Sequence, residues 1–216
     1  MDYIQVIKKI DKYIGDNIDL LQLLYPREFD CKYSNIINLI ENGKNLEQLK
    51  KEVESFFSIQ GMKHEQRINL LKLFDNEKER IKNINIKINN IFELYKDLLR
   101  KTKEITGKYQ WVNTAKLMHL YNQNIPLFDN NVINFLNYLN VEIEHRIENS
   151  FLHILYLYEQ INVSKNIPNI IKLNNNIYSN MTIKYINLIK FIDTLMYFIN
   201  DTKELKKYVS LCEKHG

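Results

Sequence analysis

The residues of this chain best suited to chemistry lie between Trp111 and Val132. Lys116 stands near an expected helix start, and Asp129 follows a proline-containing loop and opens the next helix. A lysine amine becomes a nucleophile when burial or a nearby cation lowers its pKa enough to leave it partly neutral. A carboxylate at a helix N-cap stays ionised, because backbone N–H groups and the helix dipole favour its charge. This stretch therefore offers a candidate amine and a candidate carboxylate about one helix apart.

Three other side chains of the same stretch are candidates for holding a substrate. Trp111 is the single tryptophan, Tyr121 is a second aromatic, and His119 lies three positions after Lys116 and could share its helix face. Each residue also has a structural interpretation. Trp111 could pack in the core, His119 could be a semi-buried histidine with satisfied hydrogen bonds, Lys116 could be a solvated lysine and Asp129 could only cap a helix.

The stretch resembles a signature of the helix-hairpin-helix DNA glycosylase superfamily, including divergent relatives with an 8-oxoguanine-glycosylase fold. In that signature a small-residue turn leads into a helix that begins with a lysine. A Pro-x-x-Asp-like element then starts another helix, with an aliphatic residue three positions after the Asp. Thr114-Ala115-Lys116 is similar to the first part, and Pro126-Leu127-Phe128-Asp129-Asn130-Asn131-Val132 to the second.

The resemblance implies a DNA-repair-type glycosylase that acts on a flipped base, with DNA as its partner and without a cofactor. Lys116 would attack the sugar C1′ and form a Schiff base, Asp129 would stabilise an oxocarbenium-like sugar, and Trp111 or Tyr121 would stack on the base. The chain departs from the family where Trp111-Val112-Asn113 replace the hairpin Gly-x-Gly. The interval of 13 positions from Lys116 to Asp129 is also short for the family.

A second constellation lies further along the chain. Arg146 and His153 are seven residues apart, which is two helical turns, and Glu142 and Asn149 complete the same stripe. This arrangement is similar to the motif of HEPN ribonucleases, helical bundles that usually act as dimers, and implies an alternative function in RNA cleavage. The alternative structural interpretation is a polar flank beside an apolar helix face.

The composition favours long helices over strands. Only 5 Gly and 3 Pro occur in 216 residues, while hydrophobic residues make up 45%, so a packed core is expected and turns are few. We therefore predict an all-α fold, a single multi-helix domain over residues 1–216 arranged as an orthogonal bundle of eight to ten helices. Residues 1–74 could form an N-terminal helical subdomain. Stretches with helical periodicity cover about 3–14, 18–24, 36–40, 46–59, 67–74, 75–106, 114–121, 129–160, 170–177, 183–198 and 202–212.

Charge and cysteine content restrict the remaining classes. The net charge of +4 permits a nucleic-acid partner without implying one. Cys31 and Cys212 have no metal-ligand spacing, and no His, Cys or carboxylate group forms a metal motif, so no metal site is predicted. No signal peptide or membrane span is expected, which predicts a cytoplasmic protein. A third functional class stays open: a non-catalytic helical module that binds a partner protein through an exposed apolar patch.

Overall fold

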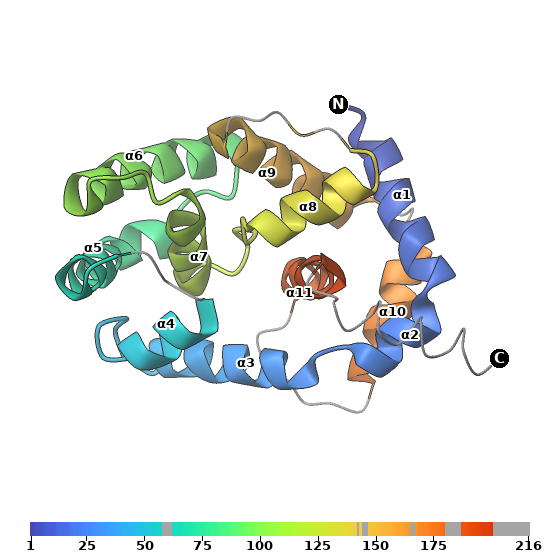
Figure 1. Ribbon diagram of the computed structural model, residues 1–216, viewed down its shortest axis with the longest axis horizontal. Helices are drawn as coiled ribbons and strands as arrows, with labels where there is room; N and C mark the ends of the chain where they lie inside the picture. Colours follow the sequence, from blue (N-terminus) through green and yellow to red (C-terminus); the bar gives the residue numbers. More distant parts are fainter. Residues whose placement is uncertain (58–61, 142, 144–146, 165–166, 180–186, 201–216) are drawn as a thin grey trace.

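Helix α11 (Leu188–Asn200) lies at the centre of the molecule. Figure 1 shows it end-on in the middle of the view, with α8 (Asn130–Tyr138) above it and α3 (Arg27–Glu41) below it. Buried apolar side chains occupy one side of α11, as expected for a helix enclosed by others. They are Ile189, Phe191, Ile192, Leu195 and Met196. The opposite side carries Lys190, Asp193 and Thr194, which are buried as well.

The computed structural model describes residues 1–57, 62–141, 143, 147–164, 167–179 and 187–200. Within these residues there are eleven helices and no strand, which confirms the predicted all-α fold. The helices run across one another at steep angles in Figure 1 and enclose a shared core. Besides α3, α8 and α11 they are α1 (Tyr3–Asp16), α2 (Ile18–Leu24), α4 (Lys50–Phe57), α5 (His64–Lys82), α6 (Ile88–Thr106), α7 (Trp111–Tyr121), α9 (Ile147–Val163) and α10 (Pro168–Tyr178).

The first helix packs against helices from the second half of the chain. α1 contacts α9 and α10, so residues of the two halves share one core. The sequence predicts an end at Gly15, but α1 continues to Asp16. Gly15 instead allows a close approach, because a Cβ there would lie 2.7 Å from the side chain of Asn169. Asn169 donates to the buried carboxylate of Asp11, which also accepts a backbone N–H bond at the start of α10.

A break at residues 83–87 separates α5 from α6, where the sequence predicts one helix over 75–106. The N–H of Asn83 bonds back to the last turn of α5, and Lys87 has the extended backbone that precedes α6. The first four residues of the alternating pattern Ile84-Asn85-Ile86-Lys87-Ile88 fall on this connection and its last residue opens α6, so the alternation does not mark a strand. Asp75, expected at a helix start, lies inside α5.

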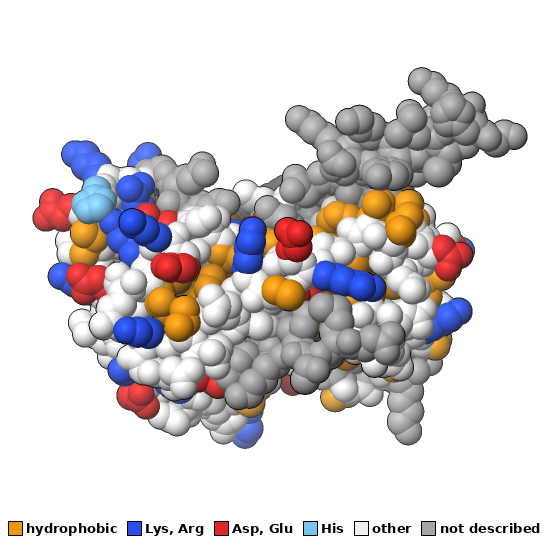
Figure 2. Space-filling view, turned by 90° about the horizontal axis from the view of Figure 1, so that it is seen from below, with side chains coloured by type: hydrophobic (Ala, Val, Ile, Leu, Met, Phe, Trp, Pro, Cys, Tyr) orange, Lys and Arg blue, Asp and Glu red, His pale blue; other side chains and the backbone are white. Residues whose placement is uncertain are grey.

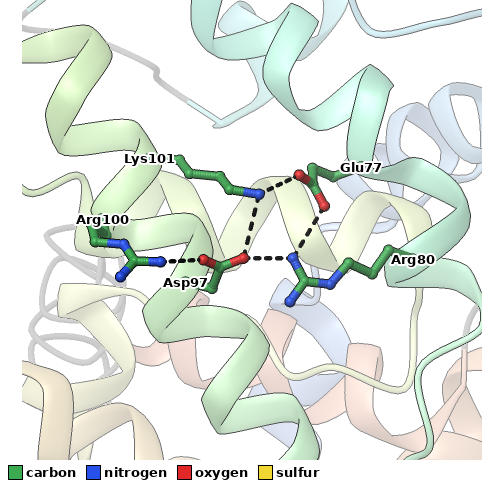
Figure 3. A network of polar contacts seen from close by, with 5 residues as sticks. All are labelled: Glu77, Arg80, Asp97, Arg100 and Lys101. Carbon is green, nitrogen blue, oxygen red and sulfur yellow. Dashed lines mark hydrogen bonds and ion pairs between the residues drawn. The ribbon is translucent and has the colours of Figure 1, made fainter.

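An ion-pair network joins α5 to α6 (Figure 3). Asp97 of α6 lies 2.5 Å from Arg80 of α5 and 2.8 Å from Arg100, and Lys101 lies 2.5 Å from Glu77. The hydrogen bond from Arg80 is the main reason that the pKa of Asp97 is lowered. Several of the basic residues in this part of the sequence are therefore paired with carboxylates that link the two helices.

Helix α8 is shorter than the sequence predicts. A helix from Asp129 to about Gln160 was expected, but α8 ends at Tyr138 and α9 begins at Ile147. Asn140 has a φ of 54°, in the left-handed region that Asn tolerates better than most residues. Its N–H bonds to the carbonyl of Asn137, and the N–H of Val141 bonds to that of Leu136. This hydrogen-bonded stop redirects the chain, and α9 then packs on α1 and α6.

Two further expectations concern the predicted last helix and membrane spans. The predicted helix over 202–212 lies outside the described residues. None of the helices within the described ranges is both long enough and apolar enough to cross a membrane.

Candidate active site

Lys116 and Asp129 meet in the folded chain. Lys116 lies in the second turn of α7, later than the first-turn position predicted, because α7 already begins at Trp111. Its Nζ is 2.6 Å from Oδ2 of Asp129, and the two side chains are 11% and 14% exposed. Oδ1 of Asp129 accepts the backbone N–H of Asn131 at 2.9 Å, which confirms the predicted N-cap of α8. One carboxylate therefore both caps a helix and fixes the amine.

The ion pair borders a pocket of about 140 Å³ between α3, α4, α7, α8 and α11. Phe29 and Phe56 form an aromatic wall, with ring centroids 4.3 Å apart. Opposite charges and apolar groups complete the lining. The remaining residues are Leu127, Asn131, Val132, Lys190, Asp193 and Thr194.

Lys190 is the second lysine of the pocket and is fully buried. Its Nζ donates to Oγ1 of Thr194 at 2.9 Å and lies 4.9 Å from the ring centroid of Phe29 and 4.7 Å from that of Tyr33. Burial lowers the pKa of Lys190 to about 8, with a further lowering by the charge of Lys116. The carboxylates Asp193 and Asp30 oppose this shift. The amine is thus partly neutral just above neutral pH.

Asp193 lies one turn after Lys190 and is also fully buried. Its Oδ2 accepts the backbone N–H of Leu127 at 2.9 Å, and its Oδ1 accepts a short hydrogen bond from the hydroxyl of Tyr158. Burial raises the pKa of Asp193 to about 7, and the charge of Asp129 adds to the rise. The hydrogen bonds and Lys190 oppose it. Asp193 therefore also ties the loop that leads to Asp129 to the central helix.

A chain of hydrogen bonds leads away from Lys190. The hydroxyl of Thr194 accepts from Lys190, so it donates its own hydrogen to Oδ1 of Asp30, at 3.4 Å. Oδ2 of Asp30 accepts a short bond from the Tyr178 hydroxyl, which lies 2.8 Å from that of Tyr25. Burial raises the pKa of Asp30, against the lowering influence of these donors and of Lys190. Tyr25 borders an open hollow on the surface, so the chain spans from the pocket toward solvent.

His119 supports the site without lining the pocket. It is fully buried, and its Nδ1 lies 2.5 Å from the carbonyl of Ile125, which can only accept, so Nδ1 carries the hydrogen. Nε2 then accepts from the hydroxyl of Tyr33 at 2.8 Å. Burial lowers the pKa of His119 to about 3, so the ring stays neutral. This histidine holds the loop before Asp129 against α3 and α7.

The two aromatic candidates of the sequence, Trp111 and Tyr121, do not line this pocket. Trp111 is half-buried and packs on Tyr109, with ring centroids 4.9 Å apart. The Tyr121 hydroxyl donates a short bond to Asp75, whose carboxylate also accepts the N–H of Leu46 at 2.7 Å. Both residues lie on α7, but their side chains contact Tyr109 and Asp75, which are not part of the pocket lining. Phe29 and Phe56, which the sequence analysis did not single out, take the aromatic positions of the pocket.

The second constellation is only partly described. Arg146 and Glu142 lie outside the described residues. His153 is half-buried on α9, and its Nδ1 lies 2.8 Å from the hydroxyl of Tyr3. The functional pairing of Arg146 with His153 therefore stays a prediction.

Charges on the face shown in Figure 2 are mixed in sign. Figure 2 shows basic and acidic side chains interspersed over the described part of one face, with several basic ones gathered at its left end. Across the described residues, no cluster of three or more His, Cys, Asp or Glu side chains could hold a metal ion.

Besides Phe29 and Phe56, the sequence analysis also missed Lys190, Asp193 and Thr194 as site residues. They lie at positions i, i+3 and i+4 of one helix, in a segment that is otherwise strongly apolar, and that spacing is a signal of a buried polar face.

Comparison of the chain with protein-family models, with curated proteins and with solved structures finds no match.

Proposed function

We propose that this protein is a DNA N-glycosylase with lyase activity that acts on a base flipped into the pocket beside Lys116 and Asp129. The observation that carries the proposal is the 2.6 Å pair of Lys116 and Asp129, which stands at an aromatic-walled pocket and not on the open surface. The resemblance of Thr114–Lys116 and Pro126–Val132 to the glycosylase signature adds support.

The reaction needs a neutral amine, and the ion pair provides a route to it. The C1′–N bond of the deoxyribose breaks and its electron pair leaves with the base, after which Lys116 transfers one proton to Asp129 and its neutral amine attacks C1′. The bond from C1′ to the ring oxygen then opens, and that oxygen takes a proton from the attached nitrogen. The product is an iminium between Lys116 and C1′. Before the amine adds, the Asp129 carboxylate stabilises positive charge that develops on the sugar.

The pocket suits a planar, largely apolar group with a polar edge. The rings of Phe29 and Phe56 supply a face for stacking, while Asn131, Asp193 and Thr194 supply polar atoms at the lining. In this arrangement the sugar lies beside Lys116 and the base extends toward the rings. Phe29 and Phe56 take the stacking role that the sequence resemblance assigns to Trp111 or Tyr121.

Borohydride trapping tests the proposal directly. The purified protein is incubated with duplexes that carry an abasic site or an oxidised, deaminated or alkylated base, and borohydride reduces the iminium to a stable adduct. We expect an adduct with the wild type and none with Lys116→Gln. In Asp129→Asn the cap can persist without the charge, so we expect normal folding and slow adduct formation.

The chain offers a matched control in another lysine–aspartate pair. Lys12 and Asp16 also lie 2.6 Å apart, but their side chains are 75% and 59% exposed. Lys12→Gln should therefore trap like the wild type. Absence of any adduct across the whole panel would refute the function, and an adduct that survives Lys116→Gln would refute the assignment of the amine.

A further inference from the structure

The pocket contains two amines in different surroundings. Lys116 is salt-bridged to Asp129, whereas Lys190 lines the pocket beside the aromatic wall, with its Nζ 4.9 Å from the centroid of the Phe29 ring and 5.9 Å from that of the Phe56 ring. Lys190 is more deeply buried than Lys116 and comes from the central helix. A group placed against the two rings therefore meets Lys190, while the group attached to it can reach Lys116.

We infer that Lys190 is a catalytic acid that protonates the departing base in the reaction proposed above. The inference rests on that proposed function and assigns a residue which the sequence resemblance does not include. As the C1′–N bond breaks, its electron pair moves onto the base. Lys190 gives one proton to a nitrogen or oxygen of the base and becomes a neutral amine. The base leaves as a neutral molecule, and Lys116 completes the attack on C1′.

The surroundings of Lys190 hold its ammonium group in place over aromatic rings, while burial makes that group easier to deprotonate than an exposed lysine. Its hydrogen bond to Thr194 orients Nζ, and its aromatic neighbours exclude water from it. Burial lowers its pKa to about 8, so the ammonium gives up a proton more easily than an exposed lysine does while staying mainly protonated at pH 7. The shift arises in a site where Asp30 faces Lys190 from α3, Lys116 from α7 and Asp193 from α11.

The hydrogen-bond chain through Thr194 can restore the proton. It continues from Thr194 to Asp30 and on to Tyr178 and Tyr25, which borders the surface hollow. Neutral Lys190 can therefore be reprotonated along a path that does not cross the occupied pocket. A substrate that fills the pocket then does not block the next cycle.

The decisive experiment separates loss of the base from attack on the sugar. Wild type and Lys190→Met are compared on two duplexes: one carries the base that the wild type releases fastest from the panel, and the other a preformed abasic site. The abasic duplex has no base to protonate. We expect Lys190→Met to release the base roughly 100- to 10,000-fold more slowly, the range of general acid catalysis. Borohydride trapping on the abasic duplex should be nearly unchanged.

The pH dependence and a milder variant give independent readouts. Base release by the wild type should fall as the pH rises above about 8, where Lys190 loses its proton, and this alkaline decline should be absent in Lys190→Met. If Lys190→Met does not fold, Lys190→Gln serves instead, because its amide can still donate to Thr194 but has no acidic proton to give to the base. It should slow base release and leave abasic trapping intact.

Three results would overturn the assignment. Equal loss of base release and abasic trapping in a folded Lys190 variant would indicate a structural role. Loss of trapping in Lys190→Met but not in Lys116→Gln would make Lys190 the nucleophile. Trapping of the abasic duplex by a wild type that releases no base from the panel would leave Lys116 as proposed and remove the need for an acid. Failure of the wild type to trap any duplex would instead refute the proposed function itself.

Discussion

Replacing Asp193 by Asn should change how the stability of the protein depends on pH. Asp193 is fully buried, and burial raises its pKa from 3.8 to about 7. The native state therefore holds a proton on this group at pH values where the unfolded chain has already released it. Because the folded pKa is the higher one, Asp193 contributes its stability fully below pH 3.8, and the contribution is lost as the pH rises toward about 7.

The size of this effect follows from the displacement of the pKa. A rise from 3.8 to about 7 corresponds to about 4 kcal/mol, at roughly 1.4 kcal/mol for each tenfold change in proton affinity. Of this, about 3 kcal/mol falls between about pH 4.5 and pH 7. Asn cannot titrate, yet its amide oxygen can still accept the N–H of Leu127. The variant should gain about 3 kcal/mol on the wild type over that pH interval.

Urea unfolding of both proteins at several pH values from about 4.5 to 7 measures the difference. Asp30, whose pKa is also raised, is present in both proteins and cancels in the comparison. In the wild type the pKa of Lys190 is lowered to about 8, so its titration lies above the interval; loss of the Asp193 charge lowers that pKa further in the variant, and this adds to the variant's gain only near the upper end of the interval. A constant difference in the free energy of unfolding across the interval, with equal m-values, would refute the assignment of a raised pKa to Asp193.

Three further changes test the packing and the caps. Asp129→Ala removes the N-cap of α8 and should lower the free energy of unfolding by about 0.5–2 kcal/mol, with Asp129→Asn much closer to the wild type in urea titrations. Gly15→Ala should destabilise the protein despite the better helix propensity of Ala, which is worth about 1 kcal/mol. The new Cβ displaces Asn169 from Asp11 and breaks charged hydrogen bonds worth about 1.5–3 kcal/mol. In an Asn169→Ala background the same change should be stabilising, and if Gly15→Ala is destabilising by an equal amount there, the clash is not the cause. Asp97→Asn should cost less than about 1 kcal/mol at low salt and still less at high salt, measured as thermal unfolding at two ionic strengths, because its partners Arg80 and Arg100 are well exposed.

The local chemistry of the chain made one part of the site predictable. The cap formed by Asp129 depends only on neighbouring residues, so the pattern from Pro126 to Val132 was sufficient to locate it. The all-α fold was equally accessible, because few Gly and Pro interrupt long apolar periodicities. Proximity of Lys116 to Asp129 is different. It follows from how α7, the intervening loop and α8 pack, and only the family signature suggested it.

Other features depend on packing that periodicity does not record. Asn140 ends α8 through a left-handed conformation, and such a stop is much less recognisable at Asn than at Gly. Lys190, Asp193 and Thr194 lie within a segment whose strong apolar period marks it as a core helix and conceals its polar side. Phe29 lies outside every predicted helix and Phe56 lies within the one predicted over 46–59, and nothing in α3 or α4 alone indicates that the two rings meet.

The central position of α11 has a consequence for how the protein is made. During synthesis α1 to α10 leave the ribosome before α11, so the partners of Phe191, Ile192 and Leu195 must wait with their apolar surfaces uncovered. Contacts such as those of Asp30 with Thr194 close a loop of 164 residues, and long loops of this kind slow folding. A nascent chain that pauses before residue 188 would thus expose the apolar surfaces that α11 covers in the folded protein, and chaperones bind surfaces of this kind. The pocket cannot form until the helix that carries Lys190 has packed, because Lys190, Asp193 and Thr194 are part of its lining.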